Sequence, residues 1–213
     1  MTASPVEPPP EAFNFAGHLL SINSSRADKT AFVDDFGALT YGELDDRARR
    51  FAAALKGQGL RREERVLILM QDGTDWPVAF LGAMLAGVVP VAVNTLNTAD
   101  DVAYMLEHSR AQGVLVSGAL KPALKAALMK ADHEVHAVVV SRPAQPLEEG
   151  ETEFNTFVGR AAPLAKSART HADDPAFWLY SSGSTGRPKG TVHSHANPYW
   201  TTELYGKAVL GLR

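Results

Sequence analysis

Apolar residues along this chain follow two alternating patterns. Continuous apolar runs, rich in Val, Ile, Leu or aromatic residues, cover residues 65–70, 88–93, 114–117, 135–140 and 176–180. Apolar residues at helical spacing lie between these runs, over residues 76–86, 98–108 and 120–131. Apolar strands that alternate with helices are typical of a parallel sheet covered on both faces. The pattern therefore predicts an α/β fold with a mostly parallel sheet covered by helices.

The first part of the chain predicts a helix, two strands and a second helix. Residues 13–22 have apolar side chains at helical spacing, and residues 30–40 predict two strands with Gly37 in the turn between them. Thr40 is followed three residues later by Glu43, which predicts a capping box at the start of the next helix. The apolar stripe expected on that helix consists of Leu44, Ala48, Phe51, Ala52 and Leu55.

Residues 76–93 are an uncharged stretch of eighteen residues, which is close to the lower limit for a membrane-spanning helix. Prolines and glycines interrupt this stretch at Pro77, Gly82, Gly87 and Pro90. A buried helix followed by a strand accounts for that pattern better than a membrane span does. We therefore expect no membrane partner.

Composition narrows the class of protein further. The 213 residues carry a net charge of −3 and show no basic stripe, so nucleic acid is not favoured as a partner. The absence of cysteine excludes a disulfide framework and a thiolate metal site, which suits a cytoplasmic protein. Residues 1–12 contain four prolines and no positive charge, so we expect a flexible tail there and not a secretory signal.

The segment most suggestive of chemistry is residues 180–190, Tyr-Ser-Ser-Gly-Ser-Thr-Gly-Arg-Pro-Lys-Gly, which follows an apolar run. Backbone N–H groups in a glycine-rich turn can form a concave anion site, and Ser and Thr hydroxyls can add donors. Lys189 supplies a compact positive charge suited to phosphate oxygens, and Pro188 limits the freedom of the backbone that carries it. The residues themselves thus predict a loop that binds a polyphosphate.

Other interpretations of this loop fit less well. The lysine follows a proline and precedes a glycine, so the segment is not a P-loop, and its glycines do not have the dinucleotide-binding spacing. Ser182 lacks the glycine two residues before it that a hydrolase nucleophile elbow needs. A Gly/Ser-rich surface linker remains the alternative, although the preceding strand and the Pro-Lys-Gly ending argue against it.

Residues 181–190 resemble the phosphate-binding signature of the adenylate-forming (AMP-binding) enzymes, which include acyl- and aryl-CoA synthetases and peptide-synthetase adenylation domains. Residues 39–44 and 81–90 resemble two further motifs of this family, in the family's order. Residues 193–206 are most similar to the corresponding segment of aryl-CoA ligases such as benzoate–CoA ligase.

The resemblance implies a fold and a domain organisation. Residues 13–213 are expected to be a partial N-terminal AMP-binding domain that ends just after the phosphate-binding loop and the helix that follows it. Segments that bind the aromatic acid, the adenine and the ribose in this family have no counterpart here, nor does the small mobile carboxy-terminal domain. We therefore expect the chain to be the front portion of a longer enzyme, whose missing C-terminal portion is its partner.

The resemblance also implies an activity and its residues. The longer enzyme is expected to use ATP, Mg²⁺ and coenzyme A to convert a benzoate-like aromatic acid into its thioester through an acyl-adenylate, as in aromatic acid degradation. The implied phosphate-binding residues are Ser181, Ser182, Gly183, Ser184, Thr185, Gly186 and Lys189. Lys189 is also the expected catalytic residue, because it offsets the charge of the leaving pyrophosphate. His195 and Asn197 are expected near the acid substrate.

Two alternatives stay open at this point. The chain by itself is a non-catalytic fragment that binds nucleotide phosphates, or it belongs to an adenylation module that loads a carrier protein. Zinc is not expected at His193 and His195, because two imidazoles without a third ligand make a poor metal site.

Overall fold

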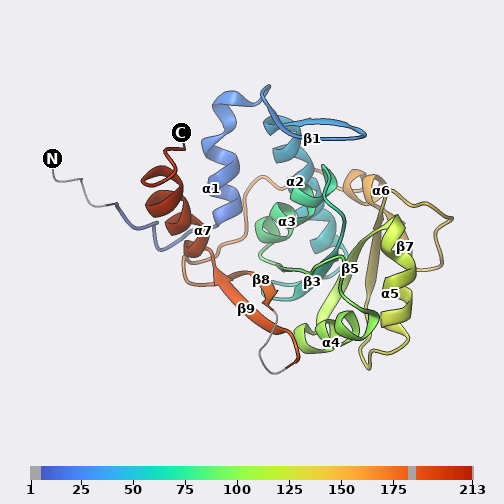
Figure 1. Ribbon diagram of the computed structural model, residues 1–213. Helices are drawn as coiled ribbons and strands as arrows, with labels where there is room; N and C mark the ends of the chain where they lie inside the picture. Colours follow the sequence, from blue (N-terminus) through green and yellow to red (C-terminus); the bar gives the residue numbers. More distant parts are fainter. Residues whose placement is uncertain (1–5, 182–185, 213) are drawn as a thin grey trace.

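The computed structural model describes residues 6–181 and 186–212. Its centre is a seven-stranded sheet with the order β7-β6-β5-β3-β4-β8-β9 (Figure 1). In chain order the strands are β3 (Arg65–Leu69), β4 (Val89–Ala92), β5 (Ala111–Ser117), β6 (Ala137–Ser141), β7 (Glu151–Glu153), β8 (Pro175–Ser181) and β9 (Lys189–Ser194). All neighbours are parallel except β8 and β9, which are antiparallel. The predicted mostly parallel sheet is therefore confirmed.

Helices cover both faces of this sheet (Figure 1). One face carries α1 (Phe15–Ile22), α2 (Tyr41–Gly57), α3 (Asp75–Ala86) and α6 (Phe154–Gly159), and the other carries α4 (Ala99–Ser109) and α5 (Lys121–Leu128). Because side chains alternate along a strand, Val66 and Ile68 of β3 belong to the first core and Leu67 and Leu69 to the second. Burial on both faces explains why β3 is apolar throughout.

The amino-terminal elements form as the sequence predicts. The strands β1 (Thr30–Asp34) and β2 (Gly37–Thr40) form a separate two-stranded antiparallel sheet. The capping box at the start of α2 is complete, since Thr40 Oγ1 accepts from the Glu43 amide at 3.2 Å and Glu43 Oε2 accepts from the Thr40 amide at 2.8 Å. The five apolar residues predicted for this helix are all buried.

Residues 76–93 form most of α3 and then β4, so the expected helix and strand are confirmed. Among the described residues, the helices are all too short or too polar to cross a membrane. The polar connection at residues 143–153 contains β7, which pairs in parallel with β6. Short single-turn segments lie at Ser24–Arg26 and Gly118–Leu120. After β9 the chain continues as α7 (Ala196–Thr201) and a π-helical segment, η3 (Thr202–Lys207).

Candidate functional site

The carboxyl edge of the parallel sheet carries two features that could bind a ligand. Strands β3 to β8 run in the same direction, so their carboxyl ends share one edge. Ligands of open α/β sheets usually bind outside this edge. The predicted phosphate loop follows β8, and a polar cavity lies beyond the ends of β3, β5 and β6.

The two limbs of the phosphate loop are neighbouring antiparallel strands. Ser181 is the last residue of β8, and it pairs with Lys189, the first residue of β9. Gly186 has φ 90°, in the left-handed region that favours glycine. The structure thus brings Ser181 and Lys189 together at the base of the loop. The remaining predicted phosphate ligands, Ser182, Gly183, Ser184 and Thr185, lie outside the described residues, so their role stays a prediction.

Lys189 is exposed and forms no ion pair with any residue that the structure describes. An unengaged ammonium group at the base of a glycine-rich loop is available to contact an anion. This placement is consistent with the predicted role of Lys189 in binding phosphate.

Aromatic residues of α4 contact both limbs of the loop. His108 Nδ1 lies 2.8 Å from the Tyr180 hydroxyl, and the Arg187 guanidinium carbon lies 5.2 Å from the centre of the Tyr104 ring. Burial, with a smaller contribution from Tyr104, raises the pKa of the Tyr180 phenol, so the hydroxyl stays protonated at neutral pH. The sequence reasoning missed Tyr104 and His108. Their only signal is a spacing of four residues on one face of a helix.

His195 lies in the interior of the protein and not on the strand β9, which ends at Ser194. Only 1% of its surface is exposed, and its Nδ1 accepts a hydrogen bond from the Phe15 amide at 3.2 Å. Burial lowers the pKa of His195 to about 4, so the imidazole is neutral at physiological pH. The position of His195 near an acid substrate stays a prediction.

Asn197 and His193 flank the buried His195 with different contacts. Asn197 is exposed, and its Oδ1 accepts from the Ser194 amide at 2.8 Å, which shapes the turn between β9 and α7. The His193 ring is stacked on Phe177 with ring centres 4.6 Å apart. Within the described part of the chain, His, Cys, Asp and Glu residues form no group of three or more that could hold a metal ion.

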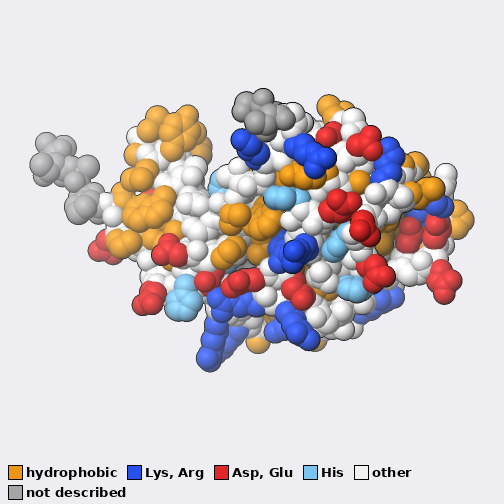
Figure 2. Space-filling model, turned by 90° about the horizontal axis from the view of Figure 1, so that it is seen from below, with side chains coloured by type: hydrophobic (Ala, Val, Ile, Leu, Met, Phe, Trp, Pro, Cys, Tyr) orange, Lys and Arg blue, Asp and Glu red, His pale blue; other side chains and the backbone are white. Residues whose placement is uncertain are grey.

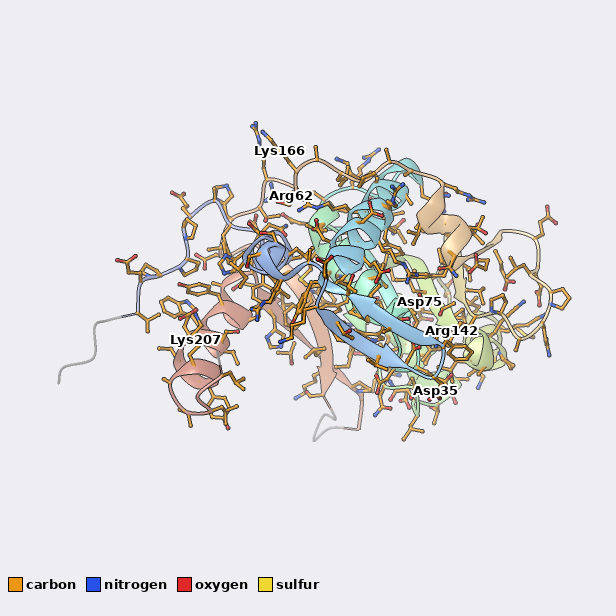
Figure 3. All side chains as sticks on the ribbon, turned by 90° about the horizontal axis from the view of Figure 1, so that it is seen from above. Asp35, Arg62, Asp75, Arg142, Lys166 and Lys207 are labelled. Carbon is orange, nitrogen blue, oxygen red and sulfur yellow. The ribbon has the colours of Figure 1, made fainter. Side chains whose placement is uncertain are left out.

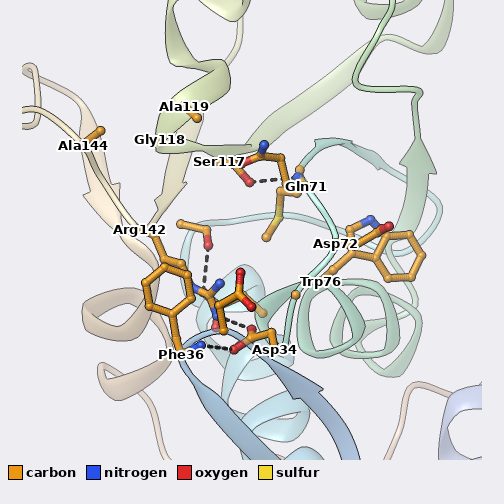
Figure 4. A pocket seen from close by; sticks show the side chains of 15 residues that line it. Asp34, Phe36, Gln71, Asp72, Trp76, Ser117, Gly118, Ala119, Arg142 and Ala144 are labelled. Carbon is orange, nitrogen blue, oxygen red and sulfur yellow. Dashed lines mark hydrogen bonds and ion pairs between the residues drawn. The ribbon is translucent and has the colours of Figure 1, made fainter.

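The polar cavity has a volume of about 360 Å³ and lies where the strand order reverses. Helix α3 follows β3 on one face of the sheet and α5 follows β5 on the other, which makes the gap between β3 and β5 the topological switch point. Figure 4 shows the hairpin tip on one side of the cavity and the end of β5 on the other. Its lining includes Asp34, Phe36, Gln71, Trp76, Ser117 and Arg142. This cavity had no counterpart in the sequence reasoning.

Hydrogen bonds fix the hairpin tip to this cavity. Asp34 Oδ2 accepts from the Arg142 guanidinium and from the Thr74 amide, the latter at 2.7 Å. The Arg142 guanidinium holds the pKa of the Asp34 carboxyl well below its usual range. Figure 3 shows Arg142 beside Asp35 at the tip of the hairpin, with Asp75 next to them. On the opposite wall, Ser117 Oγ accepts from the Gln71 amide at 2.9 Å.

Comparison with known proteins adds to this geometry. The family described as AMP-binding enzyme matches residues 21–210. The chain is 42% identical over 207 residues to benzoate–CoA ligase of Thauera aromatica, a match that covers 96% of this chain and 38% of the relative. It is 36% identical over 189 residues to 4-hydroxybenzoate–CoA/benzoate–CoA ligase of Rhodopseudomonas palustris, covering 89% of this chain and 34% of the relative.

Two solved structures share the fold. A benzoate CoA ligase from Burkholderia xenovorans LB400 has a TM-score of 0.83 and 52% identity, with 94% of this chain and 38% of that chain covered. The anthranilate CoA ligase AuaEII, in complex with anthranoyl-AMP, has a TM-score of 0.90 and 30% identity, with 96% and 39% covered. The chain thus spans less than two fifths of the length of these relatives.

Proposed function

The chain belongs to the AMP-binding enzyme family, and from this membership we propose that it is part of an ATP-dependent ligase that joins an aromatic carboxylic acid to coenzyme A. The observation that carries the proposal is the pairing of Ser181 with Lys189 at the base of a glycine-rich loop. The relatives named for benzoate or hydroxybenzoate support an aromatic acid as the substrate. The neighbour solved with anthranoyl-AMP supports an acyl-adenylate intermediate.

The proposed reaction has two steps. A carboxylate oxygen of the acid attacks the α-phosphorus of Mg·ATP, and the bond from that phosphorus to the bridging oxygen breaks, which releases pyrophosphate. The thiolate sulfur of coenzyme A then attacks the carbonyl carbon of the adenylate and displaces AMP, leaving the thioester. Each step needs mainly positioning of the reactants and stabilisation of developing negative charge.

The residues of this chain serve the first step. The loop after β8 holds the β- and γ-phosphates, and the Lys189 ammonium offsets the charge that develops on the leaving pyrophosphate. Magnesium arrives with the nucleotide as part of the substrate, because Mg²⁺ commonly binds substrate phosphates through few protein ligands. This fits the described residues, among which acidic side chains form no metal-binding group.

The 213 residues are proposed to act as part of a longer polypeptide. The chain spans 38% of its benzoate–CoA ligase relative, and its last segment exposes more than half the surface of several large apolar side chains. These residues are Leu204, Tyr205, Val209, Leu210 and Leu212. Figure 2 shows hydrophobic side chains gathered at the end of the molecule that carries this segment. A surface of this kind is typical of an interaction site, and the rest of a longer polypeptide would cover it. Residues 1–213 alone are expected to bind nucleotide phosphates without turnover.

Product analysis tests the proposal. A polypeptide that contains this chain and matches the length of its relatives is incubated with benzoate, Mg·ATP and coenzyme A. The expected products are benzoyl-CoA, AMP and pyrophosphate, and residues 1–213 alone should yield none of them. Formation of ADP and phosphate would exclude the adenylate route. Transfer to a carrier-protein thiol in place of coenzyme A would instead favour an adenylation module.

We also propose the cytoplasm as the site of action, in keeping with the absence of cysteine.

A further inference from the structure

Tyr104 and His108 form an aromatic pair at the border of the second core, where Tyr104 is half-buried against the core and His108 is exposed. They stand four residues apart, and their rings are stacked with centres 5.4 Å apart and planes 26° apart. The fully buried apolar residues of α4 are Val102, Ala103, Met105 and Leu106. In Figure 1, α4 lies beside the lower end of β9. The aromatic pair therefore lies where α4 adjoins the strands that carry the phosphate loop.

His108 contacts the limb that enters the loop. Its Nδ1 lies 2.8 Å from the hydroxyl of Tyr180, the residue before Ser181, and its ring centre lies 6.3 Å from that of Trp178. Gly190 approaches the same place from β9, since a Cβ built there would lie 3.4 Å from His108 Cε1 and 3.6 Å from Tyr180 Cε1. His108 thus contacts β8 directly and lies against the backbone of β9 at the residue after Lys189.

Tyr104 contacts the limb that leaves the loop. The guanidinium carbon of Arg187 lies over its ring, 5.2 Å from the centre, which is within the range of a cation–π contact. Arg187 makes no ion pair with any acidic residue in the described part of the chain. The ring of Tyr104 therefore helps to orient Arg187, and Pro188 restricts the backbone between Arg187 and Lys189.

Together these contacts connect both ends of the phosphate loop, at Tyr180 and Arg187, to the same side of α4. We infer that Tyr104 and His108 are positioning residues, which hold the limbs of the loop so that Ser181 and Lys189 face a bound polyphosphate. The inference rests on the proposed function for its ligand, but the holding of the limbs is a property of the chain itself. Because α4 holds the limbs of the loop before the nucleotide binds, less conformational entropy of the loop is lost on binding.

Amide hydrogen exchange tests the holding of the limbs without any substrate. In the polypeptide that contains this chain, Tyr104→Leu removes the π face under Arg187, and Tyr104→Phe keeps it. We expect exchange at residues 186–190 to be at least about threefold faster in Tyr104→Leu, with Tyr104→Phe unchanged, as for loss of a weak surface contact. Arg187→Ala, a change at an exposed residue, should give the same increase even if Tyr104→Leu unfolds. Unchanged exchange in both variants would overturn the inference.

Kinetics tests the consequence for the nucleotide. In Tyr104→Leu and Arg187→Ala the KM for ATP should rise about threefold to fivefold while the KM for benzoate stays the same, and Tyr104→Phe should match the wild type. The double variant Tyr104→Leu/Arg187→Ala should be no worse than either single variant, because both remove one contact. If the wild type forms no adenylate but amide exchange is still faster in the variants, the role of α4 is kept and the ligase proposal is removed. Normal turnover with an unchanged KM for ATP in both single variants would remove the role of α4 in nucleotide binding.

Discussion

Lys189 lies directly opposite Ser181 in the antiparallel pairing of β9 with β8. A lysine and a serine that are close in sequence are thus fixed by backbone hydrogen bonds on two adjoining strands. The same pairing places both residues at the base of the glycine-rich segment. The strand β8 is itself parallel to β4, so the loop begins at the edge of the sheet where the other parallel strands end.

Replacement of Lys189 tests its role in neutralising the leaving pyrophosphate. Lys189→Ala should slow adenylate formation at least about tenfold, equivalent to about 1.4 kcal/mol of transition-state stabilisation. Rapid-quench measurement of benzoyl-adenylate in a single turnover checks this rate. Lys166→Ala is the matched control, since Lys166 is also an exposed lysine but lies on the connection between α6 and β8 (Figure 3). Equal rates for the two variants would remove the catalytic role of Lys189.

The buried His195 predicts a pH dependence of stability. Its pKa falls from an ordinary value of 6.5 to about 4 in the fold, because burial disfavours the charged ring. Between these two values the unfolded chain binds a proton that the folded chain does not, so stability is lost as pH falls below about 6.5. The loss between pH 6.5 and pH 5 should be about 1.5 kcal/mol.

Urea unfolding across that pH range checks the prediction. His195→Gln has no titrating ring, so its free energy of unfolding should fall less steeply with decreasing pH, whatever its stability at neutral pH. The same pH slope in both proteins would show that His195 is not the group responsible.

Gly118, beside the polar cavity, should not tolerate a side chain. A Cβ at this position would lie 2.2 Å from the Arg142 carbonyl oxygen and 2.7 Å from the Ala144 amide nitrogen, both of which are backbone atoms. Gly118→Ala should therefore lower the free energy of unfolding by about 2 kcal/mol or more. Gly57→Ala is the control, since the structure leaves that position open, and it should leave the stability unchanged or raise it slightly. Thermal unfolding that ranks the two variants equally would contradict this account.

The capping box of α2 should contribute to stability through the Thr40 hydroxyl. Thr40→Ala removes the acceptor of the Glu43 amide and should cost about 1 kcal/mol. Thr40→Ser keeps the acceptor and should stay within about 0.5 kcal/mol of the wild type. Urea unfolding at neutral pH distinguishes the two, and an equal loss in both variants would show that the hydroxyl does not cap this helix.

Local sequence signals were sufficient for the elements that depend on local chemistry. The helix α2 combines a capping box with one apolar stripe, and the central parallel strands are apolar because they are buried on both faces. The strand β7 was missed because Glu-Thr-Glu has no apolar pattern, and it forms by backbone pairing to β6. The family was recognisable because its loop motif is contiguous in the sequence.

Contacts between distant parts of the chain could not be predicted from the sequence. His195 is buried, and the amide from which its Nδ1 accepts a hydrogen bond belongs to Phe15, which is 180 positions away. The contact between Asp34 and Arg142, which fixes the hairpin to the cavity, joins residues that are 108 positions apart. Arg187, in the loop between β8 and β9, contacts Tyr104 of α4. No periodicity or motif links the members of these pairs.

The exchange of labelled pyrophosphate into ATP tests the central claim most directly, because it reports adenylate formation without coenzyme A. In the polypeptide that contains this chain, we expect exchange that requires benzoate and Mg²⁺, proceeds without coenzyme A, and falls at least about tenfold in Lys189→Ala. Exchange that is absent with every aromatic acid, or that is the same in Lys189→Ala, would contradict the claim that this loop holds the polyphosphate of ATP.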